Sequence, residues 1–150
     1  MVTPLVAKDI SKSYGDEAVL SNISFSLKSN ETLSILGRSG CGKTTLLKIL
    51  GGLASPDQGT VLINQKDIQR LRPQERNVVY LYQEALLFPH LTVFENIAFG
   101  LRLRKVGDDE IRNRTRALLK KLELQGMGKK MPHQLSGGEK QRVSFGRALI

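Results

Sequence analysis

The feature that most constrains this chain is the string Gly37-Arg38-Ser39-Gly40-Cys41-Gly42-Lys43-Thr44, which fits the pattern G-x-x-x-x-G-K-[ST]. A tight, glycine-rich turn of this kind directs successive backbone amides at phosphate oxygens. Residues 32–36 before the string are a short apolar run that predicts a strand, and residues 43–50 after it have helical spacing of leucines. A strand, a glycine-rich loop and a helix in this order predict a site for a nucleoside triphosphate.

The residues of this phosphate loop (residues 37–44) have separate predicted tasks. The amine of Lys43 should reach the β- and γ-phosphates, and the hydroxyl of Thr44 should ligate Mg²⁺. The helix that begins near Lys43 adds the positive end of its dipole. We expect the nucleoside triphosphate to contact Gly37, Arg38, Ser39, Gly40, Cys41, Gly42, Lys43 and Thr44, and the family resemblance given below implies that it is ATP and that Thr45 also contacts it.

A second motif, Leu135-Ser136-Gly137-Gly138-Glu139, follows about ninety residues downstream. Ser136 and Glu139 have the spacing of a capping box, and the two glycines expose the amides of a helix start. This signature segment (residues 135–139) predicts a second anion site, but it lacks the lysine needed to hold a triphosphate alone. An ordinary capped helix is the alternative interpretation. Beside the phosphate loop, an incomplete second site favours a composite one.

The rest of the chain divides into a β-rich first part, about residues 1–83, and a helical second part, about residues 84–150, of one domain. The β-rich part has strand-like runs at residues 23–27, 60–64 and 77–82. In the helical part, Thr92 and Glu95 form a capping box, Asp108 can cap a further helix, and a last helix runs from Ser136 to Ile150.

The net charge of +9 and the pI near 9.9 are typical of proteins that bind nucleic acid or an anionic membrane. Ten of the 23 cations fall in residues 102–130, on expected surface helices, without the interleaved aromatic residues of a single-strand stacking platform. We therefore interpret the charge as a solvated face plus a polyphosphate pocket, and we expect no nucleic-acid partner. Attraction to a membrane surface is a secondary possibility.

Compartment and membrane signals are few. The lone Cys41 cannot form an internal disulfide, which fits a reducing cytosol. Residues 1–6 lack the basic start and apolar run of a secretory signal, and no stretch has the roughly eighteen apolar residues of a membrane span. If the protein serves a membrane, we expect it to do so through a partner.

The two motifs, in this order and at this distance, resemble the ATP-binding subunits of ABC transporters. The resemblance runs along essentially the whole chain, from residues 10–15 to residues 141–143. It implies an α/β fold of the P-loop NTPase, ABC type, with a β-rich N-terminal half, a phosphate-loop core and a helical subdomain.

The resemblance also implies roles for individual residues. Two subunits of the family pair head to tail, so Ser136, Gly137, Gly138 and Glu139 of one copy would complete the ATP site of the other, with Ser136 and Gly138 at the γ-phosphate. Gln83 matches the glutamine that touches Mg²⁺ and the attacking water, beside Thr44 as a metal ligand. Tyr14 sits where the family stacks an aromatic ring on adenine. The residues expected to act in catalysis are Lys43, Gln83, Ser136 and Gly138.

Partners follow from the same resemblance. Residues 87–97 resemble the surface against which importer permeases dock a short helix, and residues 94–101 and 130–136 most resemble bacterial importers of polyamines, ferric iron, sugars or oxyanions. The implied protein is an ATP-hydrolysing importer subunit, cytoplasmic and peripheral on the inner face of the membrane. Its implied partners are a second copy, transmembrane permease subunits and, indirectly, a substrate-binding protein. A non-transport ABC ATPase acting on ribosomes remains an alternative, and the transported substrate cannot be named.

Two departures from the family pattern matter. Gly146 stands in the last helix where the family is Ala-rich, and it should cost up to about 1 kcal/mol against Ala. The family's apolar strand ending in Asp-Glu and its histidine switch are absent from these 150 residues. The chain thus resembles the first part of a longer subunit, truncated before the Asp-Glu strand, and we expect it to be inactive in hydrolysis alone.

Overall fold

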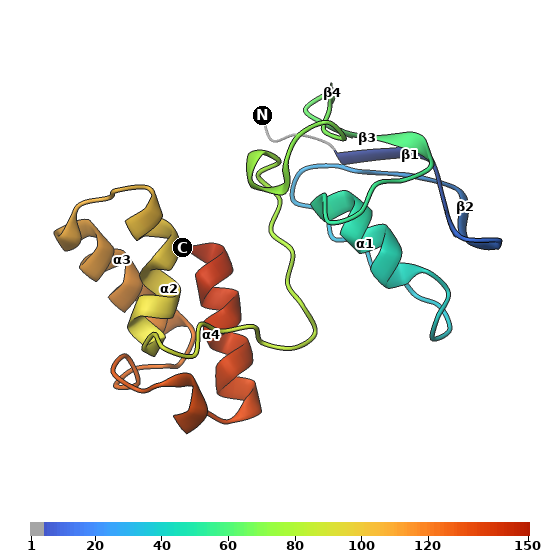
Figure 1. Ribbon diagram of the computed structural model, residues 1–150. Helices are drawn as coiled ribbons and strands as arrows, with labels where there is room; N and C mark the ends of the chain where they lie inside the picture. The colour runs from blue at the N-terminus through green and yellow to red at the C-terminus, as the bar shows by residue number, and fades with distance from the viewer. Residues whose placement is uncertain (1–4) are drawn as a thin grey trace. The chain divides into compact units, whose positions relative to one another are not determined.

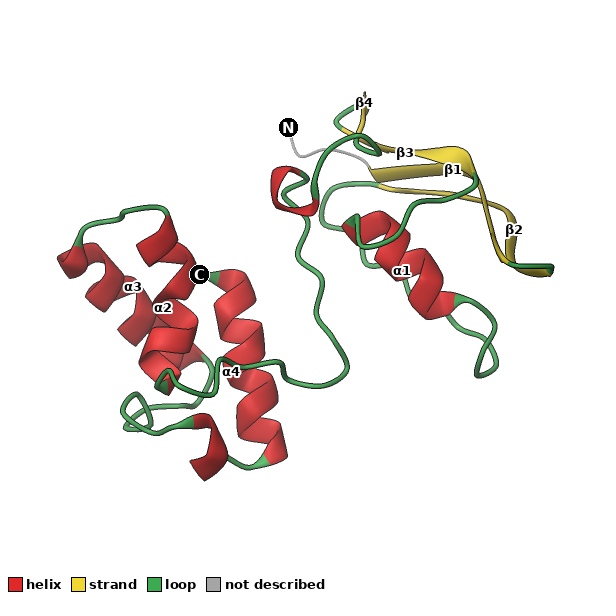
Figure 2. Ribbon diagram, viewed as in Figure 1, coloured by secondary structure: helices red, strands yellow, loops and turns green. Residues whose placement is uncertain are grey.

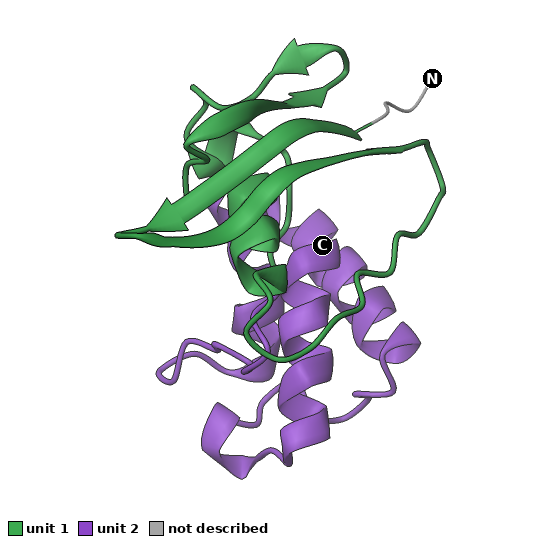
Figure 3. Cartoon of the chain, turned by 90° about the vertical axis from the view of Figure 1, so that its right-hand side faces the viewer, with its two compact units in different colours: residues 1–80 green, residues 81–150 purple. Residues whose placement is uncertain are grey.

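The structure is a computed structural model that describes residues 5–150, so part of the segment analysed for a secretory signal lies outside the described residues. The chain forms two compact units, residues 1–80 and residues 81–150, coloured separately in Figure 3. The first unit contains all the strands of the described residues, and the second contains helices and loops (Figure 2). No helix in residues 5–150 combines the length and the apolar character needed to span a membrane.

The first unit is built on a four-stranded antiparallel sheet with the order β2-β1-β3-β4 (Figure 1). Its strands are β1 (Leu5–Tyr14), β2 (Glu17–Leu27), β3 (Gln58–Ile63) and β4 (Lys66–Asp67). A tight turn at Gly15 joins β1 to β2 and pairs Tyr14 with Glu17. The runs predicted at residues 23–27 and 60–64 thus belong to β2 and β3, as expected.

Helix α1 (Lys43–Gly51) covers one face of this sheet. Leu46 and Ile49 lie one turn apart on α1 and are 5% and 1% exposed, and burial of each such side chain contributes about 1.5–3 kcal/mol. The buried core of the unit consists of Ala7, Ile10, Leu20, Leu46, Ile49, Val61 and Ile68. Because this core holds α1, it also fixes the loop that leads into the helix.

Two predicted strands are wrong. Residues 32–36 and 77–82 are not part of the sheet, and Leu36 is 90% exposed. An apolar run favours extended backbone, but a strand exists only where a neighbouring strand completes its hydrogen-bond ladder. The resemblance gives residues 32–36 an Asp-Glu strand as neighbour, and these 150 residues do not contain that strand.

The second unit packs α2 (Val93–Leu103), α3 (Asp108–Lys121) and α4 (Gly137–Leu149) around two buried apolar clusters. Short 3-10 helices at Pro132–Gln134 in this unit and Pro73–Glu75 in the first complete the elements. The residue that precedes α3 is Gly107, so Asp108 is the first helical residue rather than the cap. The buried side chains of the second unit include Ile97, Leu101, Ile111, Leu119, Leu124 and Val143.

Candidate functional site

The phosphate loop leads directly into α1. Gly40 and Gly42 have positive φ values of 83° and 91°, in the left-handed region that favours glycine. A Cβ on Gly42 would lie 2.7 Å from the carbonyl oxygen of Val19, so this position excludes a side chain on steric grounds as well. The glycine pattern of the sequence is therefore required by the observed backbone.

The side chain of Lys43 folds back over the loop. Its Nζ atom donates to the carbonyl oxygens of Gly37 at 2.9 Å and Arg38 at 2.6 Å, and it lies 3.6 Å from Sγ of Cys41. These contacts place the ammonium group at the centre of the loop, where it can exchange carbonyl oxygens for phosphate oxygens with little movement. The role of Lys43 at the β- and γ-phosphates stays a prediction.

The backbone N–H groups at the start of α1 have no capping side chain. Gly42 precedes the helix and provides no side-chain cap, and the first turn contains no acidic residue. The free amide donors and the positive end of the dipole therefore have no anionic partner within the helix. Phosphate oxygens would satisfy these donors, and the exposed Thr44 hydroxyl in the first turn could ligate Mg²⁺.

The remaining predicted nucleotide contacts of the first unit are accessible. Arg38, Ser39 and Cys41 are exposed, and Thr45 is half-buried in α1. Tyr14 lies at the end of β1 with 55% of its surface exposed, and Nζ of Lys12 lies 5.3 Å from its ring centroid. An exposed ring is what stacking on a base requires.

Arg76 is a residue of this unit that the sequence analysis did not identify. It is 7% exposed, and its guanidinium donates to the carbonyl oxygens of Ile49, Gln69 and Leu71 at 3.0–3.1 Å. Burial lowers the pKa of this guanidinium, yet it stays protonated because an arginine titrates far above neutral pH. Since Ile49 lies in the last turn of α1, Arg76 ties the C-terminal end of the phosphate-loop helix to residues 69–71. A lone arginine in a polar loop gave no signal of this role.

The signature segment forms the start of α4 and caps itself. The backbone N–H of Ser136 donates to Oε2 of Glu139 at 2.6 Å, and the N–H of Glu139 donates to Oγ of Ser136 at 3.3 Å. The hydrogen bond from the Ser136 backbone, followed by the interaction with the Ser136 hydroxyl, holds the pKa of Glu139 below its usual range. The predicted capping box is confirmed.

Neither the backbone conformation nor the packing of the second unit requires glycine at the two glycine positions of the signature segment. Both belong to α4 with ordinary helical backbone, and a Cβ on Gly137 would meet nothing within 4 Å. A Cβ on Gly138 would meet only the terminus of Arg142, at 3.8 Å. The absence of side chains at these two positions leaves the backbone of the helix start accessible to a group from outside the unit.

Gln83 lies in the second unit and is bonded to the helix that carries the signature segment. Nε2 of Gln141 in α4 donates to the backbone oxygen of Gln83 at 2.5 Å, and Nη2 of Arg147 donates to that of Leu86 at 2.6 Å. The guanidinium of Arg147 also lies 4.9 Å from the ring centroid of Phe88. Two side chains of α4 thus hold the segment that follows Gln83, and Gln83 lines a cavity of about 510 Å³ with Tyr82, Glu84 and Leu86.

Asn96 completes this arrangement and was not singled out from the sequence. The side chain is fully buried, and it accepts from the N–H of Phe88 and donates to the carbonyls of Phe88, Leu91 and Thr92. It fixes residues 88–92, part of the segment expected to face a permease. A polar residue on the apolar face of a predicted helix was the available signal.

Packing around Gly146 opposes the helix-propensity gain expected from an alanine at this position. A Cβ on Gly146 would lie 2.7 Å from Cδ1 of Leu122 and 3.2 Å from the side chain of Ile97. An alanine at this position would require the ends of these two side chains to shift, and the cost of that shift opposes the helix-propensity gain.

The two motifs and the fold that carries them define a class. The chain belongs to the ABC transporter family, whose family profile matches residues 20–150. The resemblance stated from the motifs is therefore confirmed, and so is the mixed α/β, ABC-type fold.

Individual relatives are similar over most of the chain. The spermidine/putrescine import ATP-binding protein PotA of Legionella pneumophila is 46% identical over 151 residues, covering 100% of this chain and 42% of that protein. Its namesake from Thermotoga maritima is 49% identical over 142 residues, covering 95% of this chain and 39% of that protein. The chain thus spans about two fifths of the length of these curated relatives.

A solved structure has the same fold. The ATP-binding cassette MJ0796, in a dimeric post-hydrolysis state bound to ADP and Pi, matches with a TM-score of 0.85 and 34% identity. The match covers 97% of this chain and 68% of that chain.

The structure distributes the predicted site residues between the two units. Tyr14 and residues 37–45 lie in the first unit, and Gln83 and residues 136–139 lie in the second. In the first unit the phosphate loop continues directly into α1, and in the second unit Gln141 of α4 is hydrogen-bonded to the backbone of Gln83.

Proposed function

We propose that this chain is the ATP-binding part of the energising subunit of an ABC importer. The observation that carries the proposal is the pair of unlike helix starts: an uncapped one with a lysine folded over its loop, and a self-capped one with two glycines that nothing in its own unit requires. The first can hold a triphosphate by itself. The second can only contribute to one.

In this proposal the phosphate loop binds ATP in the way its geometry suggests. Backbone amides of residues 37–44 and the Lys43 ammonium hold the β- and γ-phosphates, and the Thr44 hydroxyl and Gln83 hold Mg²⁺. The metal ion, when bound, offsets the charge that develops on the phosphate oxygens. The exposed ring of Tyr14 stacks on adenine.

A second copy completes the site. Ser136 and Gly138 of the partner approach the γ-phosphate, with Gly137 and Glu139 beside them, and the glycines let the backbone come close. Gln83 orients the attacking water. The dimeric state of the similar cassette MJ0796 supports this arrangement.

The proposed setting is the inner face of a cell membrane. Residues 87–97, held by Asn96 and Arg147, receive a helix of the permease, which in turn takes cargo from a substrate-binding protein. The names of the similar proteins, spermidine/putrescine import ATP-binding proteins, support an importer and make polyamines the first cargo to test.

Hydrolysis is proposed for the complete subunit and not for residues 1–150 alone. The resemblance assigns the general base to an Asp-Glu strand that the sequence in hand does not contain. Purified 1–150 should show no turnover above background. Turnover that disappears in Gln83→Ala would contradict this part of the proposal.

Mixing two defective variants tests the composite site. Lys43→Ala removes the loop ammonium, and Gly138→Asp puts a carboxylate at the signature segment, where there is room for it and where a helix start tolerates an acid. Neither variant alone has an intact site, whereas a head-to-tail heterodimer of the two has one.

We expect light scattering to show no ATP-dependent dimer for either variant and to show dimers for the mixture. A mixture that behaves like its components would reject the head-to-tail site. ATP titration of Gly138→Asp is the control, because binding to the monomer should be unchanged.

A further inference from the structure

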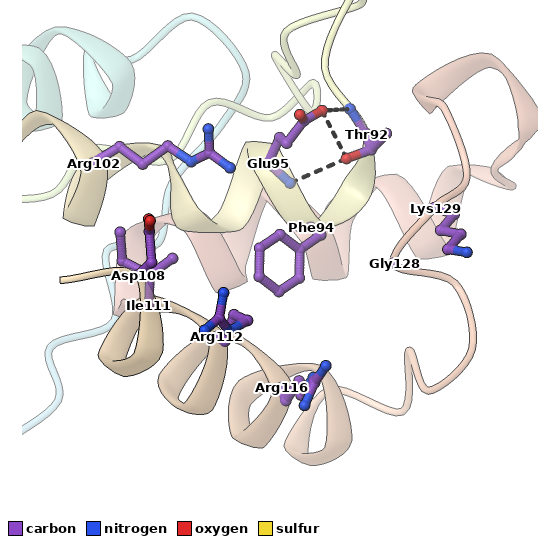
Figure 4. A pocket seen from close by; sticks show the side chains of 10 residues that line it. All are labelled: Thr92, Phe94, Glu95, Arg102, Asp108, Ile111, Arg112, Arg116, Gly128 and Lys129. Carbon is purple, nitrogen blue, oxygen red and sulfur yellow. Dashed lines mark hydrogen bonds between the residues drawn. The ribbon is translucent and has the colours of Figure 1, made fainter. Parts of the chain in front are cut away.

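The second unit has a cavity of about 520 Å³ that none of the proposed ATP chemistry uses. It is bounded by the two ends of α2, the first turns of α3 and the loop at residues 128–129 (Figure 4). The ring of Phe94 lies between α2 and α3, and the side chains of Arg112 and Arg116 rise from α3 beneath it. The cavity therefore combines an aromatic floor with a cationic edge.

Backbone hydrogen bonds hold the walls of this cavity in place. The N–H of Val93 donates to the carbonyl oxygen of Lys130 at 2.9 Å, and the N–H of Phe94 donates to that of Gly128 at 3.0 Å. These bonds join the loop to the first turn of α2. A ligand would thus enter a site that is already formed, without first ordering the loop.

The charge of the lining is positive. Four of the lining side chains are the exposed cations Arg102, Arg112, Arg116 and Lys129. In residues 5–150 the side chains of Arg116 and Lys129 have no hydrogen bond or ion pair, and Arg112 pairs with Asp109, whose side chain is 91% exposed. An exposed pair of this kind contributes little and is readily exchanged for another anion.

Two carboxylates, Glu95 and Asp108, also line the cavity. Oε2 of Glu95 accepts from the N–H and the hydroxyl of Thr92 at 2.9 and 2.8 Å, so this carboxylate is already engaged by the helix cap. The four cations outnumber the two carboxylates, so the lining favours an anion over a cation.

We propose that this cavity receives the phosphate headgroup of an anionic phospholipid, so that the second unit touches the membrane surface directly. Arginine guanidinium groups match phosphate oxygens in pairs, and the Phe94 ring offers an apolar surface for the glycerol portion. Residues 81–150 contain thirteen Lys and Arg against seven Asp and Glu, whereas residues 1–80 contain ten against seven. An excess of cations in the unit that carries an open cavity suits a sheet of headgroups better than one small anion.

The inference uses the proposed function only to place the chain beside a membrane, and its test needs neither nucleotide nor transport. The purified protein is sedimented with vesicles of phosphatidylcholine containing about a quarter phosphatidylglycerol, and with vesicles of phosphatidylcholine alone. We expect binding to the anionic vesicles, weakened by salt, and none to the neutral ones.

A matched pair of variants locates the contact. Arg112→Gln/Arg116→Gln removes two charges that line the cavity, and Lys120→Gln/Lys121→Gln removes two from the same helix outside it. The first pair should lower the vesicle partition coefficient about 25-fold, at about fivefold a charge, and the second pair by well under fivefold. Circular dichroism and ATP titration of both variants check that fold and nucleotide binding are unchanged.

Three outcomes would overturn the inference. Equal losses in the two double variants would show diffuse attraction rather than this cavity. Binding of glycerol phosphate that depends on Arg116, without vesicle binding, would identify a site for free organic phosphate instead. Loss of vesicle binding in Lys43→Ala would assign the headgroup to the phosphate loop. A protein that binds vesicles but not ATP would reject the proposed function and leave this inference standing.

Discussion

Helices α1 and α4 both begin beside glycines, yet they treat their free amides in opposite ways. Helix α1 follows Gly42, which has a left-handed backbone and no capping side chain. Helix α4 follows Ser136, whose hydroxyl and backbone form a complete capping box with Glu139. The free N–H groups of an uncapped helix start can still bind an external anion. A self-capped start has already paired some of these groups, so an anion stabilises it less.

The glycines of the two helix starts differ in the same sense. Gly42 is needed by its own unit, because both its φ angle and the carbonyl of Val19 exclude a side chain. Gly137 and Gly138 have room for a Cβ, and neither has the positive φ angle that favours glycine. In the proposed function, this difference separates a loop that binds ATP from a surface that contacts a second copy.

The largest expected effect is on nucleotide affinity. Lys43→Ala removes the ammonium at the centre of the loop, and the amides alone cannot offset a triphosphate, so ATP affinity should fall by a factor of about 100 or more. Isothermal titration with Mg-ATP measures the change. Lys48→Ala is the control, because Lys48 lies in the last turn of the same helix. Equal affinities of Lys43→Ala and the unmodified protein would remove the basis of the comparison.

The next effect contrasts the glycines through stability. Gly42→Ala should lower the free energy of unfolding by about 2 kcal/mol or more, from the left-handed backbone and the contact with Val19. Gly138→Ala should leave it unchanged or raise it by up to about 0.5–1 kcal/mol through helix propensity. Urea unfolding followed by circular dichroism compares the two. Similar losses would show that the signature glycine is structural after all.

A smaller effect concerns the cap of α4. Ser136→Ala should cost about 1 kcal/mol at neutral pH, because Oγ no longer accepts from the N–H of Glu139.

The Glu139 half of the same cap is pH-dependent. Its pKa is lowered in the folded state, so the stability it provides is present above the ordinary glutamate pKa of about 4.3 and is lost as the pH falls through the lower, folded value. Glu139→Gln should reduce this loss between pH 5 and pH 3, roughly the range in which carboxylates titrate. Glu123→Gln, on an exposed loop residue, should not. A pH profile in Glu139→Gln that matches the unmodified protein would mean that the cap does not matter in solution.

Features that depend on residues close together in the sequence were predicted more reliably than features that depend on distant residues. The capping boxes at Thr92 and Ser136 and the start of α1 at Lys43 depend on residues three or four apart, and all were predicted. Residues 32–36 and 77–82 were wrongly predicted as strands, because a strand depends on a distant neighbour.

The candidate site divides in the same way. The loop and the signature segment are contiguous strings and could be identified directly. Arg76, Asn96 and Arg147 act on carbonyls that no local pattern relates to them, and only the tertiary structure shows these contacts. The close approach of Gly146 to Leu122 is also visible only in the tertiary structure, because the sequence of neither segment indicates that the two segments pack together.

The smallest expected effect is a change in labelling rate, and it tests both helix starts at once. Sγ of the exposed Cys41 lies 3.6 Å from Nζ of Lys43, over the loop that ATP should cover. Mg-ATP should therefore slow its reaction with a maleimide at any protein concentration, because one copy suffices to bind the nucleotide. In a Cys41→Ser background, Gly137→Cys places the only thiol at the signature segment, where there is space for it. That thiol should be protected by ATP only at protein concentrations that support a dimer. Protection of both thiols at high dilution would mean that one copy covers both helix starts, and protection of neither would mean that no nucleotide binds.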